Sequence, residues 1–176
     1  MSSRTFRVMM DRVVVTGMGA VTPLGNSVEG LWEGVVRGQS GISEVRAFDA
    51  SSLRSRIAGE VKGFDPVSVF VDPRSARQAD RYAQFAVGAA REAIDQADLV
   101  SGTIPRERVG VVIGSSNGGI ASYAKQGDVL RNVGPRGLSP FGIPLLRNNM
   151  GAALVAREWG FRGPSLGLGA ACATAS

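Results

Sequence analysis

The sequence contains one cysteine, Cys172, within the small-residue run GLGAACATAS at positions 167–176. A lone cysteine is most often a small buried hydrophobic residue. Residues 164–171 are predicted to form a short strand, and a turn from strand to helix at the thiol would change its chemistry. Unpaired backbone N–H groups and a helix N-terminus favour thiolate and can hold a developing oxyanion. Both interpretations stay open, and Cys172 is the candidate nucleophile.

The absence of histidine restricts the chemistry of the 176 residues. An imidazole base and a histidine-bearing zinc site cannot be completed by these residues alone. One cysteine forms no internal disulfide, so a reducing compartment is expected. No apolar run approaches the roughly 20 residues that cross a bilayer, and the basic N-terminus lacks the apolar stretch of a secretion signal. We therefore predict a cytoplasmic protein that does not enter the membrane.

The net charge of +5 comes almost entirely from arginine, since Lys62 and Lys125 are the only lysines. A basic surface can bind nucleic acid or dock an acidic protein. The arginines are spread along the chain without a basic run or interleaved aromatic residues. This pattern argues against nucleic acid. An acidic protein partner is compatible with it, and so is an arginine-rich surface with no partner.

Apolar runs and turn signals predict an α/β fold with strands buried between helices. A first helix is expected between the cap Asn26 and Gly38, with Trp32 in the core. The longest predicted helix begins at Asp72–Pro73. The expected elements are strands at 12–17, 55–61, 108–114 and 164–171, helices at 27–37 and 70–99, and an irregular insertion with two helical pieces at about 121–160.

Two glycine-rich loops do not match nucleotide-binding motifs. After Gly17-Met18-Gly19, position 22 is threonine where a dinucleotide motif has its third glycine. The loop 114–119 lacks the Gly-Lys-Ser/Thr ending that a P-loop requires. Neither loop is taken as a phosphate site.

Several motifs occur in order between about residue 10 and residue 176: RVVVTGMGAVTPLGN, IGSSNGG, GPRGLSPFGIP, GFRGPS and ACATAS. Together they resemble the β-ketoacyl-[acyl-carrier-protein] synthases, in particular the elongating type II enzymes, to which polyketide ketosynthases are related. The resemblance implies a thiolase-like fold of two similar halves, with this chain as an incomplete first half in which a mixed sheet is flanked by helices. Residues 1–9 are then an N-terminal extension, and 10–176 are the half-domain.

The same resemblance implies a role for Cys172. It would accept an acyl group from the phosphopantetheine thioester of an acyl carrier protein, and its backbone N–H would form part of an oxyanion hole. Decarboxylation of a malonyl carrier would then yield the carbanion equivalent that attacks the acyl-cysteine. No bound cofactor is expected, because phosphopantetheine arrives on the carrier. The family's two catalytic histidines and a lysine lie in its second half, so this fragment alone is expected to be inactive.

Two further groups of positions are implied by the resemblance. Arg74 and Arg77 match a stretch where family members dock the acidic carrier protein; an internal salt bridge is the alternative. Asn117, Phe141 and Gly142 match positions near the acyl-chain pocket. A polar amide at position 117 would favour a short or oxygenated chain over a long saturated one.

Departures from the family pattern include Ala170, which replaces a hydroxyl residue, and Arg147, which interrupts an apolar stretch. They point towards a specialised or polyketide-type relative. A non-catalytic chain-length partner subunit is the main alternative, although such subunits typically lack the cysteine that is present here. A stand-alone module that binds an acidic carrier is another. A homodimer or a heterodimer is expected for the full-length protein. A stand-alone half-fold would leave a large apolar surface open, so the isolated chain should aggregate or dimerise.

Overall fold

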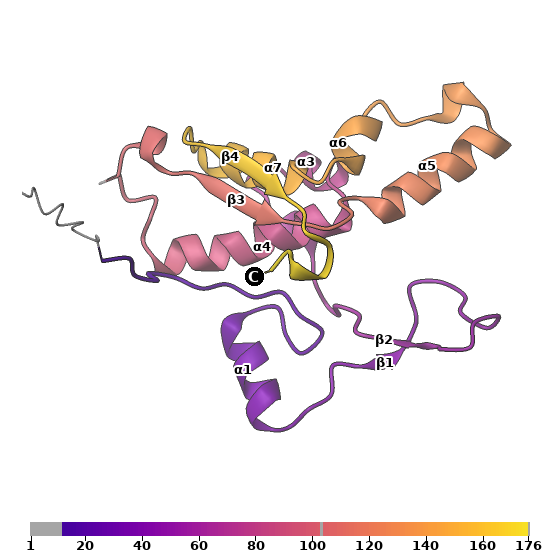
Figure 1. The fold of residues 1–176 in the computed structure, drawn as a ribbon, viewed down its shortest axis with the longest axis horizontal. Coiled ribbons are helices and arrows are strands. Elements are labelled where there is room, and N and C mark those ends of the chain that lie inside the picture. Colours follow the sequence, from indigo (N-terminus) through magenta and orange to yellow (C-terminus); the bar gives the residue numbers. More distant parts are fainter. Residues whose placement is uncertain (1–11, 103, 176) are drawn as a thin grey trace, which may run out of the picture.

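The computed structural model describes residues 12–102 and 104–175. Its elements run in an α/β order, with two short sheets and helices between the strands (Figure 1). The strands are β1 (Ser43–Glu44), β2 (Ile57–Ala58), β3 (Val111–Gly114) and β4 (Ser165–Leu168). The helices are α1 (Val28–Val36), α2 (Pro66–Val69), α3 (Pro73–Arg77), α4 (Arg81–Gln96), α5 (Ile120–Asn132), α6 (Gly142–Leu146) and α7 (Met150–Trp159), with 3₁₀ turns η1 (Arg106–Arg108), η2 (Pro135–Gly137) and η3 (Ala171–Ala173).

The centre of the fold is the parallel pair of β3 and β4, whose register runs from Val111 opposite Ser165 to Gly114 opposite Leu168. A parallel pair needs a long crossover connection, and α5, α6 and α7 lie within it. Helix α7 packs against both strands and against α4. The core therefore lies between α4, α7 and the strands, as Figure 1 shows. The stretch expected to be an irregular insertion thus supplies one of the main core helices.

The predicted helix at 70–99 is divided into α3 and α4. Asp72 caps α3 as expected, with Pro73 in its first turn. A second cap, Asp80, starts α4, so the chain turns between the two helices. Ala83, Val87 and Ile94 of α4 are buried in the core. Another face of α4, with Phe85, Ala86, Ala89 and Ala93, borders a hollow of about 730 Å³ between α4, residues 17–22 and the end of β3.

The predicted strand at 12–17 is not a strand in the structure. Val13 is 94% exposed, and this segment pairs with no strand of the described residues. Instead the chain that follows lies along α4. Met18 N–H donates to Gln96 Oε1 (2.6 Å), and Ala20 N–H donates to Glu92 Oε2 (2.9 Å). Gly19 has to be glycine here, because an added Cβ would lie 1.8 Å from a carbonyl oxygen of α4.

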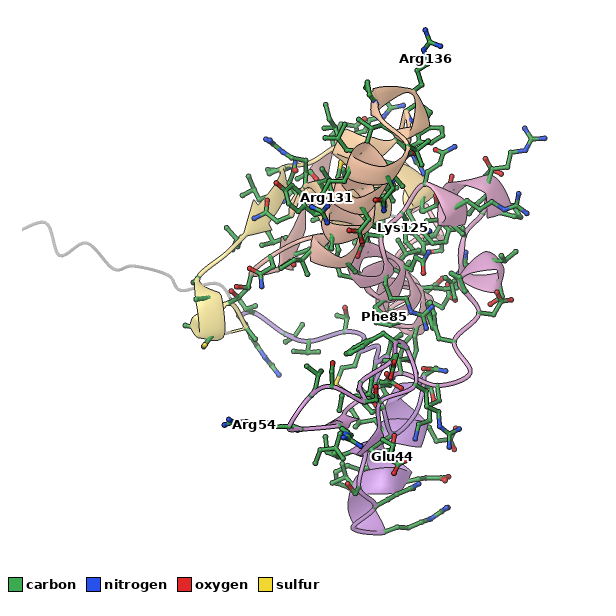
Figure 2. The ribbon with its side chains drawn as sticks, turned by 90° about the vertical axis from the view of Figure 1, so that its right-hand side faces the viewer. Glu44, Arg54, Phe85, Lys125, Arg131 and Arg136 are labelled. Atoms are coloured by element: carbon green, nitrogen blue, oxygen red, sulfur yellow. The ribbon has the colours of Figure 1, made fainter. Side chains whose placement is uncertain are left out.

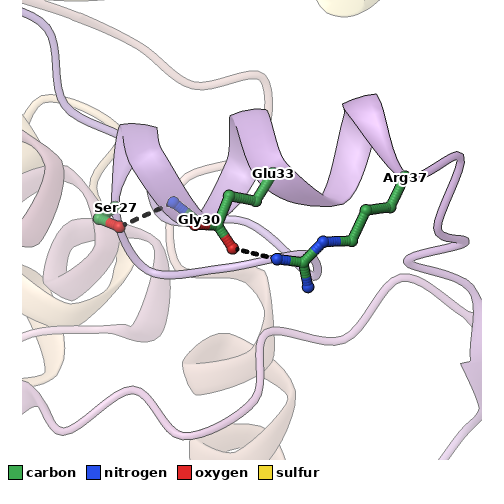
Figure 3. A network of polar contacts seen from close by, with 4 residues as sticks. All are labelled: Ser27, Gly30, Glu33 and Arg37. Carbon is green, nitrogen blue, oxygen red and sulfur yellow. Dashed lines mark hydrogen bonds and ion pairs between the residues drawn. The ribbon is translucent and has the colours of Figure 1, made fainter.

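Helix α1 lies below the main layer with β1 and β2 (Figure 1). Its cap is Ser27 rather than Asn26: the Ser27 hydroxyl accepts from Gly30 N–H (3.1 Å), and Arg37 pairs with Glu33 at 2.8 Å (Figure 3). Trp32 is 66% exposed, so its expected place in the core is wrong. Gly34 is the one residue of α1 that is buried, and the apolar side chains of Trp32, Val35 and Val36 are exposed. The weak strand expected at 55–61 is present as β2, paired with β1.

Asp80 connects the start of α4 to the start of α5. This buried carboxylate accepts hydrogen bonds from Tyr82 N–H (3.2 Å), from Ser122 N–H (3.2 Å) and from the Ser122 hydroxyl. Each bond satisfies a donor that a helix N-terminus leaves unpaired or that burial would leave without water. One side chain therefore fixes two helices relative to each other.

We expect Asp80→Ala to lower the free energy of unfolding by about 2–3 kcal/mol, because buried N–H groups of two helices lose their acceptor. Urea unfolding followed by circular dichroism measures this change. Asp65→Ala is the matched control, since Asp65 caps α2 from an exposed position, and it should cost less. Equal losses for the two variants would contradict the double role of Asp80.

Candidate active site

The ends of β3 and β4 bring two candidate segments to one edge of the sheet. Parallel strands have their carboxyl ends at the same edge, where ligands commonly bind in α/β folds. The loop with Asn117 follows β3, and the turn with Cys172 follows β4. The pairing continues past the strands, since Ser115 N–H donates to Leu168 O at 2.9 Å. Both Asn117 and the Cys172 thiol are exposed at this edge.

Cys172 lies in the single 3₁₀ turn η3, flanked by Ala171 and Ala173. The described residues after the thiol belong to this short turn. The three residues of η3 are too few to give the dipole of a full helix. A helix dipole from η3 therefore does not stabilise the Cys172 thiolate. Ala171 has a φ of +48°, a left-handed conformation that alanine rarely adopts. The chain therefore bends sharply just before the thiol.

The loop before α5 is fixed at both ends. Gly118 N–H donates to Ser115 Oγ at 3.0 Å, and Gly119 N–H donates to Leu146 O at 3.3 Å. Asp80 then holds the first turn of α5. The Asn117 side chain thus projects from a loop that is tied to α4, α5 and α6.

Phe141 and Gly142 lie at the start of α6, away from the end that contacts the loop. Gly142 lines an apolar hollow of about 550 Å³ between α5 and α6, together with Leu130 and Ile143. Phe141 is exposed and lies outside that lining. The structure thus places Gly142 beside an apolar space. Helix α6 links Gly142 to Leu146, whose carbonyl oxygen accepts the hydrogen bond from Gly119 N–H in the Asn117 loop. The structure records no direct contact between Asn117, Phe141 and Cys172.

Arg74 and Arg77 are exposed on α3, and neither forms an ion pair within residues 12–102 and 104–175. The internal salt bridge considered as an alternative is therefore not present there. A shallow groove of about 370 Å³ lies beside α3 and includes Arg157. The Glu158 carboxylate in this groove already has a hydrogen-bond partner within the chain, because it accepts from Val71 N–H at 2.7 Å.

Tyr82 joins α4 to the connection between α6 and α7. Its hydroxyl donates to Arg147 O (2.5 Å) and accepts from Gly151 N–H (3.2 Å). Burial is the main cause that raises the pKa of Tyr82 above its usual value, which keeps the hydroxyl protonated as a donor. Arg147, noted as a departure within an apolar stretch, contributes its backbone carbonyl to this contact.

Four polar residues of this region were not identified from the sequence: Asp80, Tyr82, Ser122 and Thr174. Asp80 carried a local signal, because an aspartate directly before a helical pattern is a frequent N-cap. The other three act through bonds that depend on the tertiary turn geometry. In the part of the chain that the structure describes, no helix is long and apolar enough to span a bilayer, and no group of side chains is arranged to hold a metal ion.

A family model and the most similar relatives point to the same protein family. The model of the β-ketoacyl synthase N-terminal domain matches residues 10–176. The 3-oxoacyl-[acyl-carrier-protein] synthase 2 of Synechocystis sp. is 41% identical over 165 residues, which cover 94% of this chain and 39% of that protein. The same-named protein of Coxiella burnetii is 42% identical over 93% of this chain and 39% of its own. This chain therefore spans about two fifths of the length of these relatives.

Solved structures agree on the fold. A β-ketoacyl synthase from Burkholderia phymatum matches with a TM-score of 0.77 and 26% identity, over 94% of this chain and 41% of that one. The complex AntDE:AntF, a type II PKS acyl-carrier protein with its ketosynthase bound to the hexaketide, matches with a TM-score of 0.67 and 22% identity, over 85% of this chain and 39% of that one. The fold is thus the thiolase-like one that the motifs implied, and the chain belongs to the β-ketoacyl synthase family, as its N-terminal domain.

Proposed function

We propose that this chain carries the acyl-accepting nucleophile of a β-ketoacyl-[acyl-carrier-protein] synthase. The Cys172 thiolate attacks the carbonyl carbon of an acyl thioester on phosphopantetheine. This attack forms the new carbon–Sγ bond and gives a tetrahedral intermediate. Its collapse breaks the bond from the carbonyl carbon to the pantetheine sulfur, and the released thiolate takes up the proton lost by Cys172. The observation that carries this proposal is the exposed thiol at the turn after β4, in a chain of this family.

The surroundings of Cys172 support this step. Ala171 and Ala173 are small, so a thioester can approach the thiol from the open edge. The Cys172 N–H donates to no acceptor within the described ranges 12–102 and 104–175. It is therefore available to hold a developing oxyanion, which stabilises charge that forms only in the transition state.

The second half-reaction needs groups beyond these 176 residues. Decarboxylation of a malonyl carrier and attack on the acyl-cysteine would give the β-ketoacyl product. The sequence has no histidine, so any imidazole for this step comes from outside the chain. The proposal is therefore that residues 1–176 accept an acyl group but do not complete a condensation.

Asn117 and Gly142 are the residues that bear on the length of the acyl chain. Asn117 places an amide in the loop after β3, and Gly142 leaves room in the apolar hollow beside α6. An unpaired amide disfavours a long hydrocarbon beside it. We propose a short or oxygenated acyl group, and faster acylation by long saturated thioesters than by short ones would contradict this.

An acidic acyl carrier protein is the proposed partner, and it brings the phosphopantetheine. Arg74 and Arg77 on α3 are exposed cations without an ion pair in the described chain, and AntDE:AntF is itself a complex of a ketosynthase with its carrier. The full-length protein is further proposed to form a homodimer or a heterodimer. The exposed apolar residues of α5 and α6 support this: Ile120, Tyr123, Leu130 and Ile143.

Incubation of the purified 176-residue chain with a short acyl-pantetheine thioester tests the first step. We expect intact-mass spectrometry to show one acyl adduct, which Cys172→Ala abolishes. Ser116→Ala is the control, because Ser116 is an exposed hydroxyl near the same edge, and its adduct should persist. A chain that stays unmodified, or an adduct that survives in Cys172→Ala, would refute the proposal.

The docking proposal predicts that Arg74→Glu with Arg77→Glu weakens binding of an acidic carrier protein by at least about tenfold at low salt, because two attractive contacts become repulsive. Isothermal titration measures the dissociation constant. Arg54→Glu is the matched control, since Arg54 is an exposed arginine of the connection between β1 and β2 and not of α3; Figure 2 shows it projecting on the lower left of the molecule. An equal loss in the control would mean that net charge alone, rather than α3, governs binding.

A further inference from the structure

The turn that presents Cys172 contains an unfavourable backbone conformation. Ala171 precedes the thiol with a φ of +48°. In this region the Cβ of an L-residue lies close to the following carbonyl oxygen, so a non-glycine residue needs its surroundings to hold it there. If the turn relaxed, the direction of the next side chain, Cys172, would change with it.

Thr174 provides the contacts that hold this turn. Its Oγ1 accepts a hydrogen bond from Ala170 N–H at 2.9 Å and donates one to Ala171 O at 2.7 Å. One bond therefore holds the residue before the left-handed Ala171, and the other holds Ala171 itself. The Thr174 N–H also donates to Ala171 O at 3.2 Å. One hydroxyl therefore closes the chain around Cys172.

Thr174 is in turn fixed against the end of β3. An added Cβ at Gly114 would lie 2.7 Å from Thr174 Cγ2 and 2.8 Å from Thr174 O. A side chain at position 114 would therefore push the turn away from the sheet. Thr174 is partly buried by this contact while Cys172 remains exposed, so the turn is anchored through threonine and leaves the thiol free.

We propose that Thr174 is a positioning residue for Cys172: its hydroxyl holds the strained turn so that Sγ points towards an incoming thioester carbonyl. This inference rests on the proposed function, since it assigns a purpose to the geometry of the nucleophile. Acyl transfer requires an aligned approach of the reacting atoms, and misplacement by about 1 Å can slow a reaction about a hundredfold. Alkylation by a small reagent demands access more than alignment.

The test compares two reactions of Cys172 in the 176-residue chain. Thr174→Val keeps the shape but removes the hydroxyl, and Thr174→Ser keeps the hydroxyl. We expect Thr174→Val to slow acylation by acyl-pantetheine at least about tenfold, with the rate of alkylation by iodoacetamide within about twofold of the unsubstituted chain. Thr174→Ser should restore acylation to within about threefold of the unsubstituted rate. Equal acylation in the valine variant, or parallel losses in both reactions, would overturn the proposal.

Amide hydrogen exchange at Ala170, followed by NMR, gives a readout that needs no acyl transfer. The bond to Thr174 should slow exchange of the Ala170 N–H in the unsubstituted chain and in Thr174→Ser, and Thr174→Val should exchange faster. An Ala170 N–H that exchanges freely in all three proteins would overturn the role of Thr174, whatever the acylation rates are. A protected Ala170 in a chain that is never acylated would instead refute the nucleophile, and with it the positioning role.

Discussion

The parallel pairing of β3 with β4 determines where every segment of the candidate site can lie. Four aligned residue pairs set the register from Val111–Ser165 to Gly114–Leu168. Because the strands run in the same direction, the Asn117 loop and the Cys172 turn leave the sheet at one edge. The packing of α7 against both strands and α4 keeps this pair in place. A shift of one residue would reverse the faces of β4 and misplace the turn.

The two segments at that edge are held in different ways. The Asn117 loop is tied to the body of the molecule through Asp80 and through Tyr82, which anchors the α6–α7 connection. Asp80 is buried, so the loss of its contacts would leave polar groups unsatisfied. The Cys172 turn is held by local bonds from Thr174 and by the close approach of Gly114. The Asn117 loop is thus held by contacts with other elements, whereas the shape of the Cys172 turn depends on one hydroxyl.

Local sequence patterns predicted those strands and helices that local chemistry alone determines. The runs at 108–114 and 164–171 predicted β3 and β4, because β-branched and apolar residues bounded by glycine are typical of strands. Their expected burial on both faces is wrong, since Val112, Leu166 and Leu168 are more than half exposed. The equally β-branched run at 12–17 is not a strand, since a strand also needs a partner, and side chains of α4 bind the chain that follows it. Asp80 divides the long predicted helix by capping α4 through Tyr82 N–H, a local signal, whereas its bonds to Ser122 join residues far apart in the sequence. Cys172 could be selected from its lone position among small residues, whereas the role of Thr174 depends on a turn geometry that spacing alone does not show.

If Cys172 is the residue that accepts an acyl group from a carrier protein, a carrier-bound acyl thioester should modify this residue and no other. The most direct measurement is tryptic peptide mapping of the natural gene product after incubation with an acyl-carrier thioester. Cleavage after Arg162 would release the peptide that begins at Gly163 and contains Cys172. We expect a single acyl adduct on Cys172 in this peptide. An acyl adduct on another peptide would contradict the role of Cys172. So would the absence of any adduct in a protein that binds the acyl carrier.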